Sequence, residues 1–175
     1  QAAGEPTGCA LVDFAYSVAR PKDDLVDKMP REVEATNESG RKMMSTVHAV
    51  SGKFVQYTQG GPDVVLSRCT SYLENGEVKP MTEEKRAEIM AQNKHLADKA
   101  LRVLAAAKRD WDSRPADNTP EFLEQELCFI GLTGMIDPVR PEVKAAIEEC
   151  RAAGIRPVMI TGDHKDTAVA IAKEL

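Results

Sequence analysis

The sequence has no long apolar run, few aromatic residues and no cluster of metal-binding side chains. Of its 175 residues, 5% are aromatic, four are cysteine and three are histidine. No window approaches the roughly 18 consecutive apolar residues that a membrane-spanning helix needs. The first residues also lack the basic start and apolar core of a signal peptide. We therefore expect a soluble chain, with neither a membrane span nor an export signal in this stretch.

The cysteines and the charge balance exclude two further classes of function. Cys9, Cys69, Cys128 and Cys150 form no CxxC pair and have no paired histidines nearby, so we expect reduced, mostly buried thiols and no metal site. Lys and Arg number 23 against 28 Asp and Glu, a net charge of −5. Nucleic acids are held by clustered basic residues, so a nucleic-acid partner is not expected.

The composition that is present is that of a globular chain. Hydrophobic residues make up 42% and charged residues 29%, which is enough to bury a core and ordinary for a folded soluble protein. A chain of this length has room for one full domain and part of another.

Local patterns in the N-terminal part predict helices and hairpins. A helix is expected over 10–20, with an apolar stripe that packs against a neighbour. Ser51-Gly52 and Asn75-Gly76 are turn pairs between β-rich segments and predict two hairpins. Thr82 is suited to cap a helix that runs to about Asp98.

The segment 101–109 is ambiguous between helix and strand. Its alanines favour a helix by propensity, but Val103 and Leu104 are compatible with a strand that returns to a sheet, and we predict a strand. The residues 113–120 contain two prolines, an aspartate and an asparagine, which indicates a surface loop.

The C-terminal part follows a different pattern. An apolar run at 129–132, a helix over 141–153 closed by Gly154, a second apolar run at 158–160 and a further helix predict a β-α-β-α unit with a parallel sheet. We therefore predict a boundary near Glu126. Residues 1–126 form an α+β domain with an antiparallel sheet and helices, and residues 127–175 form a truncated α/β piece.

Thr161-Gly162-Asp163 lies where the second apolar run ends and a helix begins. A hydroxyl, a flexible glycine and backbone amides at a helix N-terminus can bind a phosphoryl group. The structural alternative is that Thr161 ends the strand and Asp163 caps the helix. The triplet alone does not decide between them.

The surrounding sequence gives the triplet a context. The segment 134–167, GMIDPVRPEVKAAIEECRAAGIRPVMITGDHKDT, resembles the hinge and phosphorylation-domain region of P-type ATPases, especially the calcium-pump branch. The resemblance implies a haloacid-dehalogenase-like fold for this piece. It also implies a hinge at Asp137, Pro138 and Arg140, a phosphoryl contact at Thr161 and Gly162, and a nucleotide and magnesium contact at Asp163.

Four N-terminal motifs resemble the nucleotide-binding domain of the same family. They are GEPT at 4–7, RKMMS at 41–45, GGPD at 60–63 and LRVLA at 101–105. By this resemblance, nucleotide contacts fall on Thr7, Lys42, Met44, Gln59, Gly60 and Arg102. Each has a structural alternative: the cations can be solvated surface residues, the methionine can fill the core and the glycine can serve a turn.

The departures from the family pattern concern the adenine pocket and the phosphorylation site. Gly8 stands where a glutamate is usual, Asn37 where an aromatic stacks on adenine, and Gln59 where a lysine lines the pocket. The DKTGT motif, whose aspartate is phosphorylated, and the GDGxND motif are absent from the sequence. We therefore expect the chain to be a fragment that holds the nucleotide but lacks the nucleophile.

The resemblance implies a parent that couples ATP hydrolysis, through an aspartyl phosphate, to cation transport across a membrane. Calcium is the ion that the branch implies, with ATP and Mg²⁺ as cofactors. The fragment would lie at the cytoplasmic face, with the remaining phosphorylation domain, the actuator domain and the transmembrane domain as its partners.

Two other functions stay open at this point. One is a haloacid-dehalogenase-type phosphatase, which needs a DxDxT nucleophile; Asp110-Trp111-Asp112 has the nearest spacing but lacks the threonine. The other is a non-catalytic interaction domain that has lost nucleotide binding, which the changes at Gly8, Asn37 and Gln59 favour.

Overall fold

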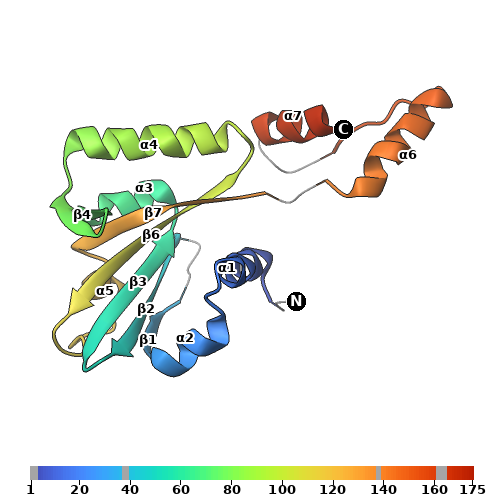
Figure 1. The fold of residues 1–175 in the computed structure, drawn as a ribbon. Coiled ribbons are helices and arrows are strands. Elements are labelled where there is room, and N and C mark those ends of the chain that lie inside the picture. Colours follow the sequence, from blue (N-terminus) through green and yellow to red (C-terminus); the bar gives the residue numbers. More distant parts are fainter. Residues whose placement is uncertain (1–3, 37–39, 137–138, 161–164) are drawn as a thin grey trace.

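A computed structural model describes residues 4–36, 40–136, 139–160 and 165–175 (Figure 1). The helices within these residues are α1 (Pro6–Ser17), α2 (Lys22–Lys28), α3 (Pro62–Ser67), α4 (Glu83–Ala97), α5 (Pro120–Leu123), α6 (Pro141–Ala152) and α7 (Lys165–Glu174). The strands are β1 (Arg31–Ala35), β2 (Met43–Val50), β3 (Lys53–Gly60), β4 (Cys69–Glu74), β5 (Glu77–Pro80), β6 (Arg102–Trp111) and β7 (Leu127–Met135).

The strands form one seven-stranded sheet with the order β1-β2-β3-β6-β7-β4-β5 within the described part of the chain. Neighbouring strands pair antiparallel except β4 and β7, which run parallel. The expected α+β architecture is therefore present, but the sheet is mixed rather than antiparallel. The reason is that α4 carries the chain across the sheet from β5 to β6, so β4 meets β7 without a hairpin between them.

Both predicted hairpins are confirmed. Ser51 and Gly52 join β2 to β3, and Asn75 and Gly76 join β4 to β5, with positive φ at all four residues. Two consecutive left-handed residues form the turn whose twist matches that of the flanking strands. The local sequence was sufficient here because turn chemistry alone selects this geometry.

The predicted helix after Thr82 and the predicted strand at 101–109 are also confirmed. The Thr82 hydroxyl accepts a hydrogen bond from the Lys85 amide at the start of α4, and Asp98 follows its end. β6 covers the ambiguous alanine-rich segment, and Ala105 and Ala107 are fully buried within it. Small side chains at these two positions let the strand lie close to the helices that cover it.

The hydrophobic core lies on one face of the sheet. Met43, Ala105, Leu127 and Phe129 pack there with residues of α3 and α4, and Val47 packs with Leu123 of α5. Figure 1 shows α3 and α4 on this side and α1 with α2 on the other. Since α3, α4 and α5 all cover the same face, the opposite face of the central strands stays partly open.

The expected packing stripe on the first helix is not formed in the described residues. α1 begins at Pro6, earlier than expected, and none of its residues is buried. Phe14 is 60% exposed, and Val18 lies beyond the last turn and is also exposed. Only Leu11 and Ala15 of the expected stripe are half-buried, because α1 lies beside the end of β7 and not over the sheet centre.

The predicted β-α-β-α order is only partly present. The apolar run at 129–132 does not open a separate parallel unit but belongs to β7, which lies between β6 and β4 in the sheet. The chain therefore leaves the sheet after Met135 and not near Glu126. The expectation that this run opens a separate parallel unit was wrong, because a hydrophobic run indicates a buried strand without indicating which strands lie beside it.

The two helices of that unit are confirmed as α6 and α7. Gly154 follows α6 with positive φ, as a helix-ending glycine does. The run 158–160 forms no strand, and Ile160 is 94% exposed. A strand needs a neighbour for its backbone hydrogen bonds, and the described residues supply none here. Across the described ranges, no helix is long and apolar enough to cross a membrane.

The cysteines provide a test of the core. Cys69 and Cys128 are buried, whereas Cys9 and Cys150 are partly exposed, so the expectation of mostly buried thiols holds for two of the four. The Cys69 thiol donates to the Val65 carbonyl oxygen at 3.2 Å, and burial raises the pKa of Cys69 to about 12.

We predict that iodoacetamide at pH 8.5 modifies Cys150 but not Cys69 in the folded chain. With its raised pKa, Cys69 holds roughly a thousandfold less thiolate than an unfolded cysteine at this pH. Peptide mass spectrometry before and after addition of denaturant measures the difference. Equal modification of Cys69 in both samples would contradict the burial of Cys69 in the core.

Candidate functional site

The open face of the sheet carries a row of residues in register across four strands. Met44 of β2 pairs with Gln59 of β3, Gln59 with Ala106 of β6, and Ala106 with Gly131 of β7. The Gln59 amide donates to the Met44 sulfur at 3.1 Å. A side-chain methyl group at position 131 would have no neighbouring atom within 4 Å of it. The row thus places two small residues beside two longer, half-buried side chains.

Successive residues of β2 point to opposite faces of the sheet, and this decides the role of the two methionines. Met43 is buried in the core at 1% exposure, and Met44 lies on the open face, half-buried. The methionine that fills the core is therefore Met43 and not Met44.

Lys42 lies in the turn before β2 at the same end of the sheet. It is exposed, and its φ of 54° places a non-glycine residue in the left-handed region. Its carbonyl oxygen accepts a hydrogen bond from the Gly61 amide at 3.1 Å. The lysine ammonium thus extends from a backbone segment that is tied to the end of β3.

Gly60 is required by a close approach between backbones and not by a turn. It ends β3, and a Cβ at this position would lie 2.4 Å from the Lys42 carbonyl oxygen and 2.8 Å from Met43. The expectation that Gly60 serves a turn is therefore corrected. Only glycine lets β3 lie this close to the Lys42 turn.

Arg102 and Thr7 meet where β6 begins and α1 starts. Arg102 Nη1 donates to the Thr7 hydroxyl at 3.2 Å, which links two residues far apart in the sequence. Glu5 accepts from the Gly8 amide at 3.1 Å and caps α1. The pKa of Glu5 is lowered, and the largest cause is a hydrogen bond from the Thr7 side chain. The hydrogen bond from the Gly8 amide and the positive charge of Arg102 lower it further.

These contacts lie along a hollow between α1 and the ends of β6 and β7, lined by Glu5, Thr7, Arg102 and Met135 among others. Gly60 pairs with Ala105, so Arg102 lies three residues along β6 from the Lys42 turn. Three strand residues span about 10 Å. The structure therefore brings the predicted residues together in two groups at one end of the sheet: Met44, Gln59, Gly60 and Lys42 in the first, Thr7 and Arg102 in the second.

The other predicted site residues lie apart from this region or outside the described part. Arg140 is exposed and precedes α6. Asp137, Pro138, Thr161, Gly162, Asp163 and also Asn37 lie outside the described residues. Among the residues that are described, no three His, Cys, Asp or Glu side chains form a group suited to a metal ion.

Asp110 and Asp112, the nearest match to a phosphatase nucleophile, are surface residues with lysine partners. Asp110 accepts from Lys108 at 2.9 Å, and Asp112 lies 3.6 Å from Lys53 with a fully exposed side chain. They stand at the far end of β6 from Arg102. This placement argues against a nucleophile at these positions.

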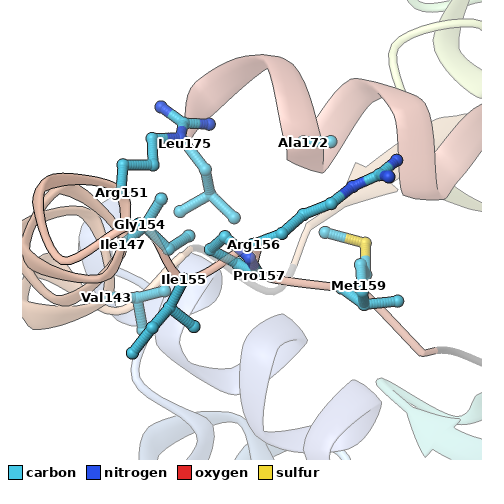
Figure 2. A pocket seen from close by; sticks show the side chains of 11 residues that line it. Val143, Ile147, Arg151, Gly154, Ile155, Arg156, Pro157, Met159, Ala172 and Leu175 are labelled. Atoms are coloured by element: carbon cyan, nitrogen blue, oxygen red, sulfur yellow. The ribbon is translucent and has the colours of Figure 1, made fainter.

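A second hollow lies between α6, the segment 154–159 and α7. Figure 2 shows Val143, Ile147, Ile155 and Leu175 around it, with Arg151 and Arg156 also among the labelled side chains. Its lining is mainly aliphatic, with no carboxylate, hydroxyl or thiol among the side chains. Its described lining thus consists of apolar side chains and the side chains of Arg151 and Arg156.

Sequence reasoning missed a buried polar cluster beneath the site. Ser45, Gln56, Thr58 and Glu124 are all buried on the core face. A signal was present: Ser45 lies between Met43 and Val47 with the period of two that marks one face of a strand. A polar residue in such a row indicates a buried hydrogen-bond partner.

Comparison with known proteins identifies the family. A family model described as P-type ATPase, cytoplasmic domain N, matches residues 1–142. The chain belongs to the P-type ATPases. Its α+β sheet with flanking helices agrees with this domain, as the sequence motifs implied.

The relatives of this P-type ATPase chain carry the names of different ion transporters. It is 46% identical to Calcium-transporting ATPase 1 of Bacillus cereus and 44% identical to Calcium-transporting ATPase lmo0841 of Listeria monocytogenes. It is 33% identical to the Sodium/potassium-transporting ATPase subunit alpha of Tetronarce californica. Each match covers 98% of this chain and 18–19% of the relative. The chain thus spans about a fifth of their length.

The close approach at Gly60 generates a prediction. Gly60→Ala should lower the free energy of unfolding by about 1–3 kcal/mol, since the new methyl group must displace the Lys42 carbonyl or Met43. Gly131→Ala on the same face is the matched control, and we expect a change within about 0.5 kcal/mol because that position is open. Urea denaturation of both variants measures this. Equal effects would refute the assignment.

Proposed function

We propose that this chain is the ATP-binding part of a P-type ATPase that couples ATP hydrolysis, through an aspartyl phosphate, to cation transport. The observation that carries the proposal is the open sheet face, where a row of small and half-buried residues adjoins two exposed cations, Lys42 and Arg102. The family membership and the four motifs that fall on this region support it.

The row of Met44, Gln59, Ala106 and Gly131 suits the adenine ring. A flat ring needs a floor without long side chains, which Ala106 and Gly131 provide. Met44 and Gln59 supply a polarizable sulfur and an amide at the side of that floor. Gln59 replaces the lysine of the family pattern, so we expect a site with one cation fewer and weak binding, with a dissociation constant of about 1 mM.

Lys42 and Arg102 suit the phosphates. Both are exposed cations at the same end of the sheet as the proposed adenine floor. Arg102 is restrained by its hydrogen bond to Thr7, which reduces the side-chain freedom lost on binding. Mg²⁺ is commonly held through substrate phosphates with one or two carboxylates, and Asp163 is the carboxylate that the resemblance implies.

The C-terminal residues suit a connection to a second domain. We infer that Asp137, Pro138 and Arg140 form the hinge and that α6, the segment 155–160 and α7 belong to the haloacid-dehalogenase-like phosphorylation domain, with Thr161, Gly162 and Asp163 at its phosphoryl site. The exposed apolar side chains of 155–160 support this, because such residues pack on neighbouring strands in a complete sheet. The actuator and transmembrane domains would be further partners at the cytoplasmic face of a membrane.

We infer calcium as the transported cation. The relatives at 42–46% identity are named calcium transporters, whereas those named for sodium and potassium have lower identity. The side chains that would select the ion belong to the membrane-spanning part of the parent protein.

Lys42→Gly tests the phosphate assignment. Glycine keeps the left-handed backbone without strain, so we expect stability to change by no more than about 0.5 kcal/mol. Loss of the cation should weaken Mg-ATP binding by roughly three- to tenfold, a range reduced by solvent screening. Isothermal titration calorimetry measures the dissociation constants of Mg-ATP for the wild-type chain and for Lys42→Gly.

Lys53→Ala is the matched control. The substitution removes one positive charge, as Lys42→Gly does, but Lys53 lies at the opposite end of β3. We expect wild-type affinity for this variant. Equal losses in the two variants would show that only the net charge matters, and no loss in Lys42→Gly would refute the phosphate role.

We also predict that this chain forms no acyl phosphate, because it contains no DKTGT aspartate. Incubation with radiolabelled ATP and Mg²⁺, followed by acid quench, should leave the protein unlabelled. A label that hydroxylamine removes would show a nucleophile within the 175 residues and overturn the proposal that the chain only holds the nucleotide.

A further inference from the structure

A connected set of polar side chains lies on the core face of the sheet, behind the proposed nucleotide site. Ser45 and Thr58 share a hydrogen bond of 2.9 Å between their hydroxyls, and Ser45 donates to Glu124 at 3.0 Å. Gln56 donates to Thr58 at 3.0 Å and accepts from the Trp111 indole at 3.1 Å. This buried network therefore runs from β6 through β3 and β2 to the residue that follows α5.

The network ends in an ion pair between Glu124 and Arg41. Arg41 Nε lies 2.9 Å from Glu124 Oε2, and the two side chains are 16% and 3% exposed. Arg41 Nη2 also donates to the carbonyl oxygens of Thr36 and Met43. One guanidinium thus links the chain just after β1, the start of β2 and a buried carboxylate.

The ion pair holds one side of the Lys42 turn. Arg41 directly precedes Lys42, which has the strained left-handed φ, and Gly61 binds the Lys42 carbonyl from the other side. A left-handed residue other than glycine persists only where its surroundings fix it. Among the described residues, Arg41 with Glu124 contacts one side of this turn, and Gly60 with Gly61 contacts the other.

We propose that Glu124 is a positioning residue for the nucleotide site. It lies on the core face and does not contact the ligand. By fixing Arg41 it fixes the Lys42 turn, and with it the place of the Lys42 ammonium and of Met44 on the open face. This inference rests on the proposed function, because it assigns the turn to nucleotide binding.

The free energy of unfolding can show whether the Arg41–Glu124 ion pair positions the turn or only stabilises the fold. A buried ion pair contributes little net stability compared with well-packed apolar side chains of similar volume, because both charges lose their hydration. An apolar pair can therefore replace the contribution of Arg41 and Glu124 to stability. It cannot reproduce the hydrogen bonds from Arg41 to Thr36 and Met43, which hold the turn.

The first test is Glu124→Gln in the whole 175-residue chain. The carboxamide keeps the shape and can still accept from Ser45, but Arg41 loses its charged partner. We expect exchange of the Gly61 amide to become roughly tenfold faster and the dissociation constant of Mg-ATP to rise about fivefold. NMR-detected hydrogen exchange and calorimetric titration measure the two effects.

The second test is the double variant Arg41→Met with Glu124→Leu. We expect wild-type resistance to urea, together with the faster Gly61 exchange and the weaker ATP binding. If this variant retains wild-type Gly61 exchange and wild-type affinity, the ion pair is only structural and the proposal is overturned. This variant decides the question even where Glu124→Gln fails to fold.

Trp111→Phe is the matched control, because it removes the hydrogen bond to Gln56 at the other end of the network. We expect lower resistance to urea with unchanged Gly61 exchange and unchanged ATP affinity. Equal acceleration of Gly61 exchange in this variant and in Glu124→Gln would count against a specific role for Glu124.

The exchange measurement separates the two proposals. If the wild-type chain binds no Mg-ATP, the proposed function fails. Accelerated Gly61 exchange in the double variant would then still show that the ion pair holds the turn, whereas unchanged exchange would refute that as well.

Discussion

The pairing of β6 with both β3 and β7 is the constraint on which the rest of the structure depends. It joins the β1-β2-β3 meander to β7, β4 and β5, so that one sheet spans nearly all of the described N-terminal part. Ala105 and Ala107 permit it, because larger side chains would push β6 away from the helices on the core face. With three helices on that face, the opposite face of the central strands stays partly open, and this is the surface that we propose for the nucleotide.

The local signals of the sequence were reliable where they act through neighbouring residues. Turn pairs such as Asn75-Gly76 and the Thr82 cap specify a geometry within a few residues, and both were predictable. The position of β7 between β6 and β4 was not predictable, because an apolar strand has the same composition in a parallel unit and at the centre of a mixed sheet. The parallel pairing of β4 with β7 likewise depends on contacts between segments far apart in the chain.

The residues of the candidate site were proposed from the sequence motifs, but their geometry could not be predicted from them. The motifs indicated Lys42, Gly60 and Arg102 through a family resemblance. The structure adds the backbone geometry at two of these positions, Gly60 and Lys42. Gly60 is glycine because a carbonyl oxygen occupies the space of its side chain, and Lys42 adopts a backbone conformation that no sequence pattern indicates. Glu124 escaped notice because its partners come from distant strands.

The path of β7 has a mechanical consequence. The strand pairs with β6 along its length, with β4 beside it at its start (Figure 1). A force applied at Met135 along the strand axis acts on many backbone hydrogen bonds in shear, so they must break together and not one after another. A pull on Met135 is thus shared by the whole sheet, without first peeling a strand from it.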